Sequence, residues 1–438
     1  MVLGAFVALL VGTEAVFTGL AALNLRHGER TLDERRRFVT EELGVEDVRE
    51  LRRYVRVGTA LGQVRTWAGL GAVLLVVPTG LLGAAVESLA GLGLGTVAEG
   101  TVFFVGVAVA LRLAAVPFDL ADTFGVEQAF GFNNQSPRLW VRDTVVGLAL
   151  TVVFVAPLAA AVVWLLVSFP GLWWVGAWAV FLAFSLAMFV LYPRVIAPLF
   201  NDFEPIETGD LRDAVEEVLD RAGFSCEQIY EMDASRRTSH SNAYFIGFGR
   251  TKRVVLFDTL VERLSLPALQ AVLAHELAHW QENHVWKQLG ATALRTGVLL
   301  GVLSVLVDAP WLATAFGLPA GATYAHLAVA ALFVEPLARL SAPLENRPSL
   351  AHEREADAFA VEVMGAGEPM ADALAALLSE NLSNPFPHPW YAAFHHSHPP
   401  VPERIRRVRE LGGGRSDGAV EGGAGAHGSA TEEAADGA

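Results

Sequence analysis

The chain has 438 residues, of which 53% are hydrophobic and only 18% carry a charge. Soluble globular proteins average about 25% charged residues, so this composition predicts a membrane protein. The formal net charge of −15 disfavours nucleic acid as a partner, because nucleic-acid binding needs a basic surface. The single cysteine, Cys226, excludes an internal disulfide.

Seven apolar stretches reach or approach the length of about 20 residues that spans a hydrocarbon core. In chain order they are 2–23, 67–89, 101–118, 144–168, 171–192, 286–308 and 321–341. The first lacks a cationic leading region and a clear cleavage site, so we interpret it as an anchor and not a signal peptide. Arg295, Glu335 and Arg339 interrupt the last two, and a buried core helix is the alternative for each.

Lysine and arginine fall almost entirely on one side of the predicted membrane. They gather in the polar connections 24–66, 119–143, 193–285 and the C-terminal tail. The opposite side carries none, and comprises the N-terminus, 90–100, 169–170 and 309–320. The positive-inside rule therefore predicts an N-terminus outside the cell and a C-terminus in the cytoplasm.

Several polar segments have recognisable local patterns. Residues 24–66 are charged, and we interpret them as a solvated amphipathic helix at the membrane surface. Residues 210–222 have helical spacing, and the stretches QIYEM, NAYFIGF and RVVLFDTL are typical of short strands, so we expect a sheet of about three strands. From 412 onward the chain is rich in Gly, Ala and acid without periodicity, which indicates disorder.

The sequence HELAHW at 275–280 places chemistry in an apolar helix. Ser265 can cap this helix and Pro267 suits its first turn, so we expect it to run over about 266–285. His275 and His279 are one turn apart on the same face, and Glu276 lies beside that face. This is the H-E-x-x-H arrangement of zinc peptidases. The alternative is two helix histidines that are hydrogen-bonded in a polar pocket, and the metal interpretation requires a third ligand.

The third ligand is expected on a second helix. The extended form of the motif would place a histidine at position 285, which is valine, and His284 should point around the helix. The segment HEREADAFA, in a helix expected to open at Pro348 and run to about 364, offers Glu353. Asp357, one turn further on, can accept the free N–H of a ligand histidine, whereas Glu355 should point elsewhere. A charged solvent-exposed face is the alternative interpretation of this helix.

These motifs resemble the type I CAAX prenyl proteases, which are integral-membrane zinc metalloendopeptidases. The matching stretches follow the family's order and lie at 198–205, 239–260, 271–280, 353–360 and 394–405. The resemblance covers most of the chain. It implies a mainly α, polytopic fold: seven transmembrane helices around a water-filled chamber, with a small α+β zinc-peptidase domain and the site near the cytoplasmic side. The segment 260–270 is shorter than in some relatives, which affects accessory contacts alone.

The resemblance also implies site residues. His275, His279 and Glu353 match the ligands of one Zn²⁺ per chain, and Glu276 matches the general base. Asp357 matches an aspartate that is sometimes assigned as a proton donor, and we expect it to support a ligand histidine instead.

Two further stretches match substrate-handling parts of the family. His395 and His398 match the H-x-S-H-P stretch and Arg404 the arginine after it, which would donate to the developing oxyanion or bind the substrate backbone. Without the resemblance, HHSHPP would be an ordinary polar loop. SNAYFIGF matches the family's edge strand, where Asn242 would help to hold an extended peptide.

We therefore divide the chain into five parts: five transmembrane helices (1–200), a peptidase segment (201–285), two further spans (286–341), a ligand helix with HHSHPP (342–411) and a tail (412–438). The expected substrate is a peptide or protein, prenylated at its C-terminus or not. One alternative is a heat-shock-type quality-control protease, although such proteins have about four spans. Another is a metal-binding transporter that uses charges within the spans, but a transporter has no need of a base such as Glu276.

Overall fold

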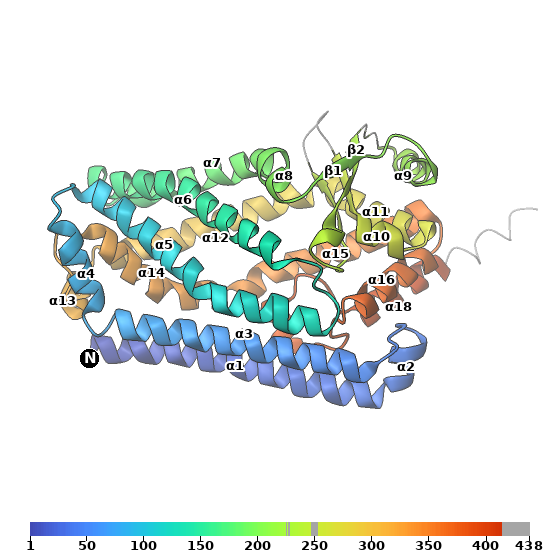
Figure 1. Ribbon diagram of the computed structural model, residues 1–438, viewed down its shortest axis with the longest axis horizontal. Helices are drawn as coiled ribbons and strands as arrows, with labels where there is room; N and C mark the ends of the chain where they lie inside the picture. The colour runs from blue at the N-terminus through green and yellow to red at the C-terminus, as the bar shows by residue number, and fades with distance from the viewer. Residues whose placement is uncertain (225, 227, 247–252, 414–438) are drawn as a thin grey trace, which may run out of the picture.

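The computed structural model describes residues 1–224, 226, 228–246 and 253–413, and is mainly helical with one small sheet (Figure 1). The membrane part up to residue 200 comprises α1 Val2–Glu34, α2 Arg36–Glu41, α3 Val48–Val76, α4 Leu81–Ala90, α5 Thr96–Ala121, η1 Asp122–Glu127, α6 Pro137–Ser168, α7 Trp173–Leu191, η2 Tyr192–Ile196 and α8 Ala197–Phe200. The predicted tail lies outside the described residues except for 412 and 413, which end the last helix.

The remaining elements alternate between a polar part and two more long apolar helices. They are β1 Phe203–Pro205, α9 Asp210–Arg221, β2 Gln228–Met232, η3 Ala234–Arg236, β3 Ala243–Ile246, β4 Arg253–Phe257, α10 Asp258–Arg263, α11 Leu266–Gln281, α12 His284–Val307, α13 Pro310–Phe316, α14 Thr323–Leu340, α15 Ala342–Met364, α16 Glu368–Glu380, α17 Pro389–His395 and α18 Val401–Gly413.

Within the described residues, seven helical segments are long and apolar enough to cross a membrane, which confirms the predicted number. Five of them come before residue 201, and α12 and α14 supply the other two. The predicted buried-core alternative does not hold for α12, because Leu294, Val298 and Val305 of this helix are exposed. The N-terminus, α4 and α13 lie at one end of the molecule and the sheet at the other (Figure 1).

The second span is placed differently from its prediction. The apolar stretch 67–89 is divided at Pro78 and Gly80. α3 ends before them at Val76, and α4 begins directly after Gly80, which is left-handed with a φ of 86°. The spanning helix is therefore α3, which starts nineteen positions earlier, at Val48.

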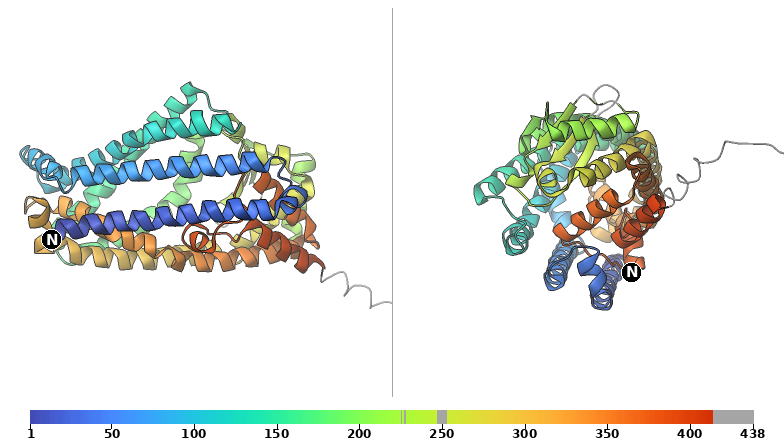
Figure 2. Two further views of the ribbon diagram at one scale, coloured as in Figure 1. Left: turned by 90° about the horizontal axis from the view of Figure 1, so that it is seen from below. Right: turned by 90° about the vertical axis from the view of Figure 1, so that its right-hand side faces the viewer.

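Residues 24–66 therefore do not form one surface helix. They comprise the C-terminal end of α1, the short helix α2 and the N-terminal part of α3. The two long helices run side by side (Figure 2). Arg52 pairs with Asp33, and Arg56 donates to Glu29 over 2.9 Å, so opposite charges join the helices beyond their apolar parts.

The helices around the interior bury little surface. In α3 only Val48 and Leu51 are buried, and in α5 only Glu99 and Gly100. Helices in a close-packed bundle bury a whole apolar face, so α3 and α5 make few close contacts and leave most of their surface open to lipid or to the space between the helices. A close approach does occur at Gly100, where a Cβ atom would lie 2.9 Å from Val163 of α6 and 3.0 Å from Tyr324 of α14.

The sheet has the strand order β1-β2-β4-β3. β2 and β4 are parallel and the outer pairs antiparallel, so β3 forms one edge. Three strands were predicted; β1 is the additional one, and it has only three residues and contains a proline. Val254 and Leu256 of β4 pack in the core with α9 and α11, whereas Val255 faces the opposite side.

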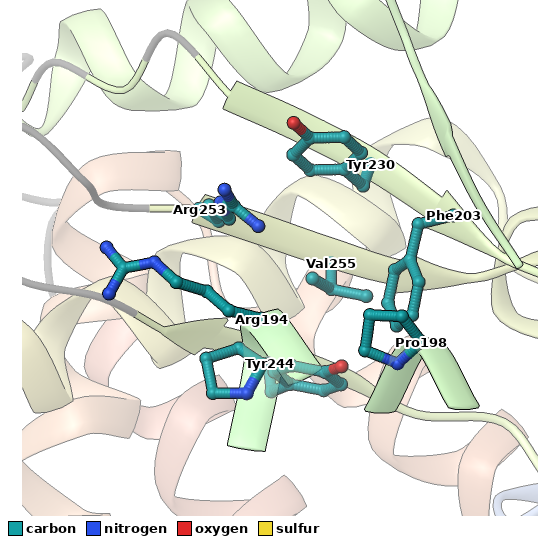
Figure 3. Close-up of a pocket in the computed structure, with 8 residues that line it drawn as sticks. Arg194, Pro198, Phe203, Tyr230, Tyr244, Arg253 and Val255 are labelled. Carbon is teal, nitrogen blue, oxygen red and sulfur yellow. The ribbon is translucent and has the colours of Figure 1, made fainter. Parts of the chain in front are cut away.

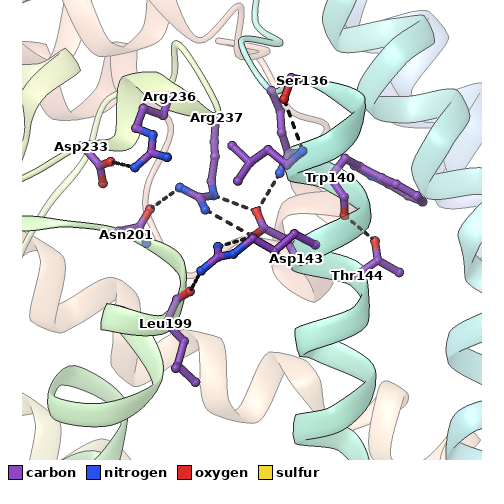
Figure 4. Close-up of polar contacts among 12 residues, drawn as sticks. Ser136, Trp140, Asp143, Thr144, Leu199, Asn201, Asp233, Arg236 and Arg237 are labelled. Carbon is purple, nitrogen blue, oxygen red and sulfur yellow. Dashed lines mark hydrogen bonds and ion pairs between the residues drawn. The ribbon is translucent and has the colours of Figure 1, made fainter.

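The sheet region is fixed to the membrane part through Arg237 (Figure 4). Its guanidinium donates to Asp143 of α6 over 3.0 Å and to Asn201 over 3.2 Å. On the same approach to β3, His240 lies 3.1 Å from Glu127 and 2.8 Å from Asn381. These contacts set the height of β3 relative to the membrane helices.

The charges that interrupt the last two spans are paired. Arg339 of α14 donates to Glu14 of α1 over 2.7 Å and lies 3.9 Å above the ring of Phe17. Arg295 of α12 donates to Glu345 over 2.7 Å. An unpaired charge within a membrane span would be costly, and pairing reduces this cost. Each pair also joins two helices.

We expect Glu14→Leu to lower the thermal stability of the purified protein more than the double substitution Glu14→Leu/Arg339→Leu does. Removing Glu14 leaves the partly buried Arg339 with only the longer, 3.6 Å contact to the more exposed Glu335, which costs up to about 3–5 kcal/mol, whereas removing both partners leaves no cation to pair. Melting temperatures in detergent test this, with the exposed Glu87→Leu as a control that should change little. Equal melting temperatures for the single and double variants would contradict a stabilising pair.

Candidate functional site

Helix α11 begins where the sequence predicts it. The hydroxyl of Ser265 accepts a hydrogen bond from the amide of Ala268 over 3.4 Å, and Pro267 occupies the first turn. The helix ends at Gln281, earlier than expected, because Asn283 adopts a left-handed conformation with φ of 57°. His284 is thus the first residue of α12 and approaches α11 from a new direction.

Three donor atoms from α11 and α15 converge on one point. His275 Nε2 and His279 Nε2 are 3.4 Å apart. Glu353 places one carboxylate oxygen 3.4 Å from His275 Nε2 and the other 3.4 Å from His279 Nε2. His275 is 5% exposed and Glu353 3%, so the point is shielded from bulk water on the side of α11 and α15. This set of one carboxylate and two imidazoles could hold one metal ion.

A second layer of side chains orients His275. Its Nδ1 lies 3.0 Å from the carboxylate of Asp357, which is fully buried. Arg404 of α18 donates to both oxygens of that carboxylate, over 3.0 and 2.7 Å. The pairing with Asp357 places the proton of His275 on Nδ1 and leaves Nε2 free for a metal.

The same carboxylates change the charge of His275 when no metal is bound. Burial alone would lower its pKa, but hydrogen bonds to Asp357 and Glu353 raise the pKa to about 9. The imidazole is then protonated at neutral pH. A metal ion must displace this proton, so metal binding is linked to proton release.

His279 has a supporting chain of its own that the sequence did not predict. His279 Nδ1 lies 3.1 Å from His284 Nδ1, and His284 Nε2 lies 2.9 Å from Glu355 Oε2. The ring of His284 also stacks on His352, with centroids 4.1 Å apart. His284 and Glu355 are not among the three donors, but the expectation that they point away from the site is wrong, because the helix breaks at Asn283 and brings His284 against His279. That asparagine, a residue tolerant of left-handed geometry, was the available signal.

A cavity of about 360 Å³ adjoins the donor atoms. Its lining includes Phe245 of β3 together with Glu276, His279, Trp280 and His284. The Glu276 carboxylate makes no hydrogen bond or ion pair within the described part of the chain, so it is available to a molecule in the cavity.

The predicted substrate-handling residues fall in different places. His398 Nδ1 lies 2.7 Å from Glu353 Oε2, and its side chain is 62% exposed. Arg404 is buried behind the donors and bound to Asp357, so it is not placed to meet an oxyanion. Asn242 is exposed at the start of β3, but its side chain accepts a hydrogen bond from the neighbouring amide of Ala243 over 2.9 Å.

His395 does not join the donor cluster. Its ring stacks on Tyr391, with centroids 4.0 Å apart, and it lines a separate cavity of about 420 Å³ with Glu14 and Arg339. Residue spacing in HHSHPP therefore does not predict contact with one site, because α17 ends at His395 and the chain turns before His398.

The chain matches two protein families. Residues 205–412 match peptidase family M48, and residues 31–202 match the CAAX prenyl protease N-terminal region of five membrane helices. A CAAX prenyl protease 1 homolog of Arabidopsis thaliana is 36% identical over 70% of this chain and 72% of its own length. CAAX prenyl protease 1 of Saccharomyces cerevisiae is 32% identical over 71% of this chain and 72% of its own length.

The fold agrees with a solved structure. The crystal structure of S. mikatae Ste24p superposes with a TM-score of 0.82 at 25% identity, covering 92% of this chain and 98% of that one. The family implies a metal, and the converging donors of α11 and α15 are suited to hold one. The chain therefore belongs to peptidase family M48, as an integral-membrane metalloendopeptidase of the CAAX prenyl protease type.

Proposed function

We propose that His275, His279 and Glu353 bind one Zn²⁺ ion. Donors at about 2.1 Å from a tetrahedral zinc are about 3.4 Å from each other, which matches the 3.4 Å between the two Nε2 atoms. One oxygen of Glu353 lies 3.4 Å from His275 Nε2 and its other oxygen 3.4 Å from His279 Nε2, so the carboxylate faces the same point. Two histidines and a glutamate are also a standard catalytic set for zinc, with a fourth position for water. The observation that carries the proposal is this group of three donor residues beside the carboxylate of Glu276, which has no partner among the described residues.

The residues around the ion have separate roles in the proposed mechanism. Zinc, when bound, supplies Lewis acidity and lowers the pKa of a water molecule. Glu276 lies in the cavity and accepts the proton from the attacking water, then returns it to the leaving amine. His398, exposed beside Glu353, donates to the oxyanion. Asp357 holds His275 in its ligating tautomer, and Arg404 fixes Asp357.

The substrate is a peptide that binds in extended form along β3, with Asn242 near its start. Among the described strands β3 pairs with β4 alone, and its Phe245 borders the cavity that contains Glu276. An edge strand offers unpaired backbone groups to such a peptide. The relatives are named CAAX prenyl proteases, and we propose proteins prenylated near the C-terminus as the substrate class here.

The site faces the cytoplasm in this proposal. The sheet lies at the end of the molecule opposite the N-terminus (Figure 1), on the side that carries nearly all Lys and Arg. The positive-inside rule assigns that side to the cytoplasm and the N-terminus to the exterior. A transporter would leave the unpaired carboxylate of Glu276 without a role, and seven spans exceed the four of heat-shock-type proteases.

One zinc ion per chain is expected in the purified protein, and His275→Ala or His279→Ala should remove it. Each substitution takes away one of three protein ligands. Metal analysis of the variants tests this prediction, and His396→Ala serves as the control because His396 is not among the donors. Full zinc content in both ligand variants would disprove the site.

His284→Ala should weaken zinc affinity by roughly 10- to 100-fold without removing a ligand, because supporting partners of ligand histidines have effects of this size. Glu355→Gln should act in the same direction but less. Competition with a chelator of known affinity measures the change. Unaltered affinity in His284→Ala would show that the contact with His279 does not orient this ligand.

Glu276→Gln separates the base from the ligands. Zinc should remain bound, and cleavage should fall by about 10²- to 10⁴-fold, the usual contribution of general acid–base catalysis. Cleavage of matched prenylated and unprenylated peptides, zinc content and peptide affinity are measured on one preparation. Near-normal cleavage with zinc bound would exclude Glu276 as the base. If the wild-type protein cleaved the prenylated and the unprenylated peptide equally well, recognition of the prenyl group would be excluded.

A further inference from the structure

A further pocket lies on the face of the sheet that is turned away from α11. Its volume is about 220 Å³ (Figure 3). One wall is formed by η2 and α8, which end the fifth span, and the other by Phe203, Tyr230, Tyr244, Arg253 and Val255 of the strands. The alternation of β4 places Val255 here and its neighbours toward α11, so this pocket is separate from the proposed peptidase site.

The pocket holds two arginines for which the described residues provide no acidic partner. Arg253 donates to the neutral side chain of Gln228 over 2.7 Å and lies 5.4 Å from the centre of the Tyr230 ring. Arg194 is exposed and forms no hydrogen bond or ion pair within the described residues. In Figure 3 the two guanidinium groups lie on the same side of the pocket. Two such arginines together are unexpected in a chain with 47 acidic and 32 basic residues.

The nearest acidic side chains of the strands are directed away. Phe203 and Tyr230 face the pocket, so the residues that follow them, Glu204 and Glu231, face the opposite side of the sheet. Burial raises the pKa of Tyr244 to about 12, so its hydroxyl stays protonated at neutral pH. The residues that line the pocket therefore include two cations and no carboxylate.

The pocket lies at a membrane boundary. Arg194 belongs to the last turns of the spanning segment Trp173–Phe200. Around it Leu191, Tyr192, Val195 and Leu199 are exposed, as expected for residues in contact with lipid. This end of the span is on the Lys/Arg-rich side, proposed above to be cytoplasmic, where membranes carry anionic lipids.

We propose that Arg194 and Arg253 bind a phosphate group carried by the headgroup of an anionic phospholipid in the adjoining leaflet. Guanidinium groups match phosphate with paired, charge-assisted hydrogen bonds. The lipid's acyl chains would lie along the exposed apolar residues of the fifth span. This site does not depend on the peptidase mechanism, since none of its residues contacts the zinc donors.

The experiment titrates the delipidated full-length protein in detergent with phosphatidylglycerol or phosphatidylcholine, and counts bound lipid by native mass spectrometry. We expect the wild-type protein to prefer phosphatidylglycerol. Arg194→Gln and Arg253→Gln should each weaken its binding roughly fivefold, the usual effect of one basic residue at a membrane surface. Arg194→Lys and Arg253→Lys should retain most of the affinity, which separates loss of charge from a folding defect.

Arg138→Gln is the matched control. Arg138 is exposed in the first turn of α6 on the same side of the membrane, and it does not line the pocket. It should change phosphatidylglycerol binding less than twofold, and an equal loss in this control would overturn the site in favour of general surface charge. A third arm uses inorganic phosphate. If inorganic phosphate displaces bound phosphatidylglycerol at concentrations as low as those at which the lipid itself binds, the lipid assignment is overturned.

Discussion

The site depends on the crossing of α11 and α15. The i,i+4 spacing of His275 and His279 is a property of one helix, but it provides only two donors. The third, Glu353, must be held 3.4 Å from both by packing between two helices. Small residues at the contact allow this approach, since Ala271, Ala274, Ala278, Ala356 and Ala360 are all nearly or fully buried.

Hydrogen bonds behind the donors fix the orientation of the two imidazole rings, which helix packing alone does not determine. Packing sets the distance between the helices, and hydrogen bonds set the rotation of each imidazole. Asp357, held by Arg404, orients His275, and His284, held by Glu355, orients His279. Each imidazole thus has a buried or half-buried partner on its Nδ1 side, which directs both Nε2 atoms to the same point. The side chains that support His275 include Arg404 of α18, and those that support His279 include His284 of α12. The site therefore requires the whole polar part of the fold.

Sequence predicts the parts of this site that are local. HELAHW and the Glu353–Asp357 pair each lie within one helix, where spacing determines which side chains share a face. The role of His284 was not predictable in this way, because it depends on a helix break at Asn283. The inner position of Arg404 and the displacement of His395 depend on where α17 and α18 pack, which residue spacing does not determine.

The same distinction explains the membrane part. Composition gives the number of spans, because each needs enough apolar length, but it misplaces the second one. The first two turns and middle of α3 contain Arg, Glu and Gln, so an apolar search begins too late and continues through Pro78. The polar half of α3 is held beside α1 by charge pairs between residues 19 and 27 positions apart, which local composition does not reveal.

The strands connect the two proposed sites through the alternation of their side chains. A shift of one residue in strand register would exchange the two faces of the sheet. Phe245 would then leave the peptidase cavity, and Tyr244 and Arg253 would leave the arginine pocket. Because Arg194 lies at the end of a spanning helix, a lipid bound there would fix the sheet at the membrane boundary. The edge of β3, and a peptide extended along it, would then be presented at a constant height above the lipid, where a prenyl group anchored in the same leaflet could stay in the membrane while its peptide reaches Glu276.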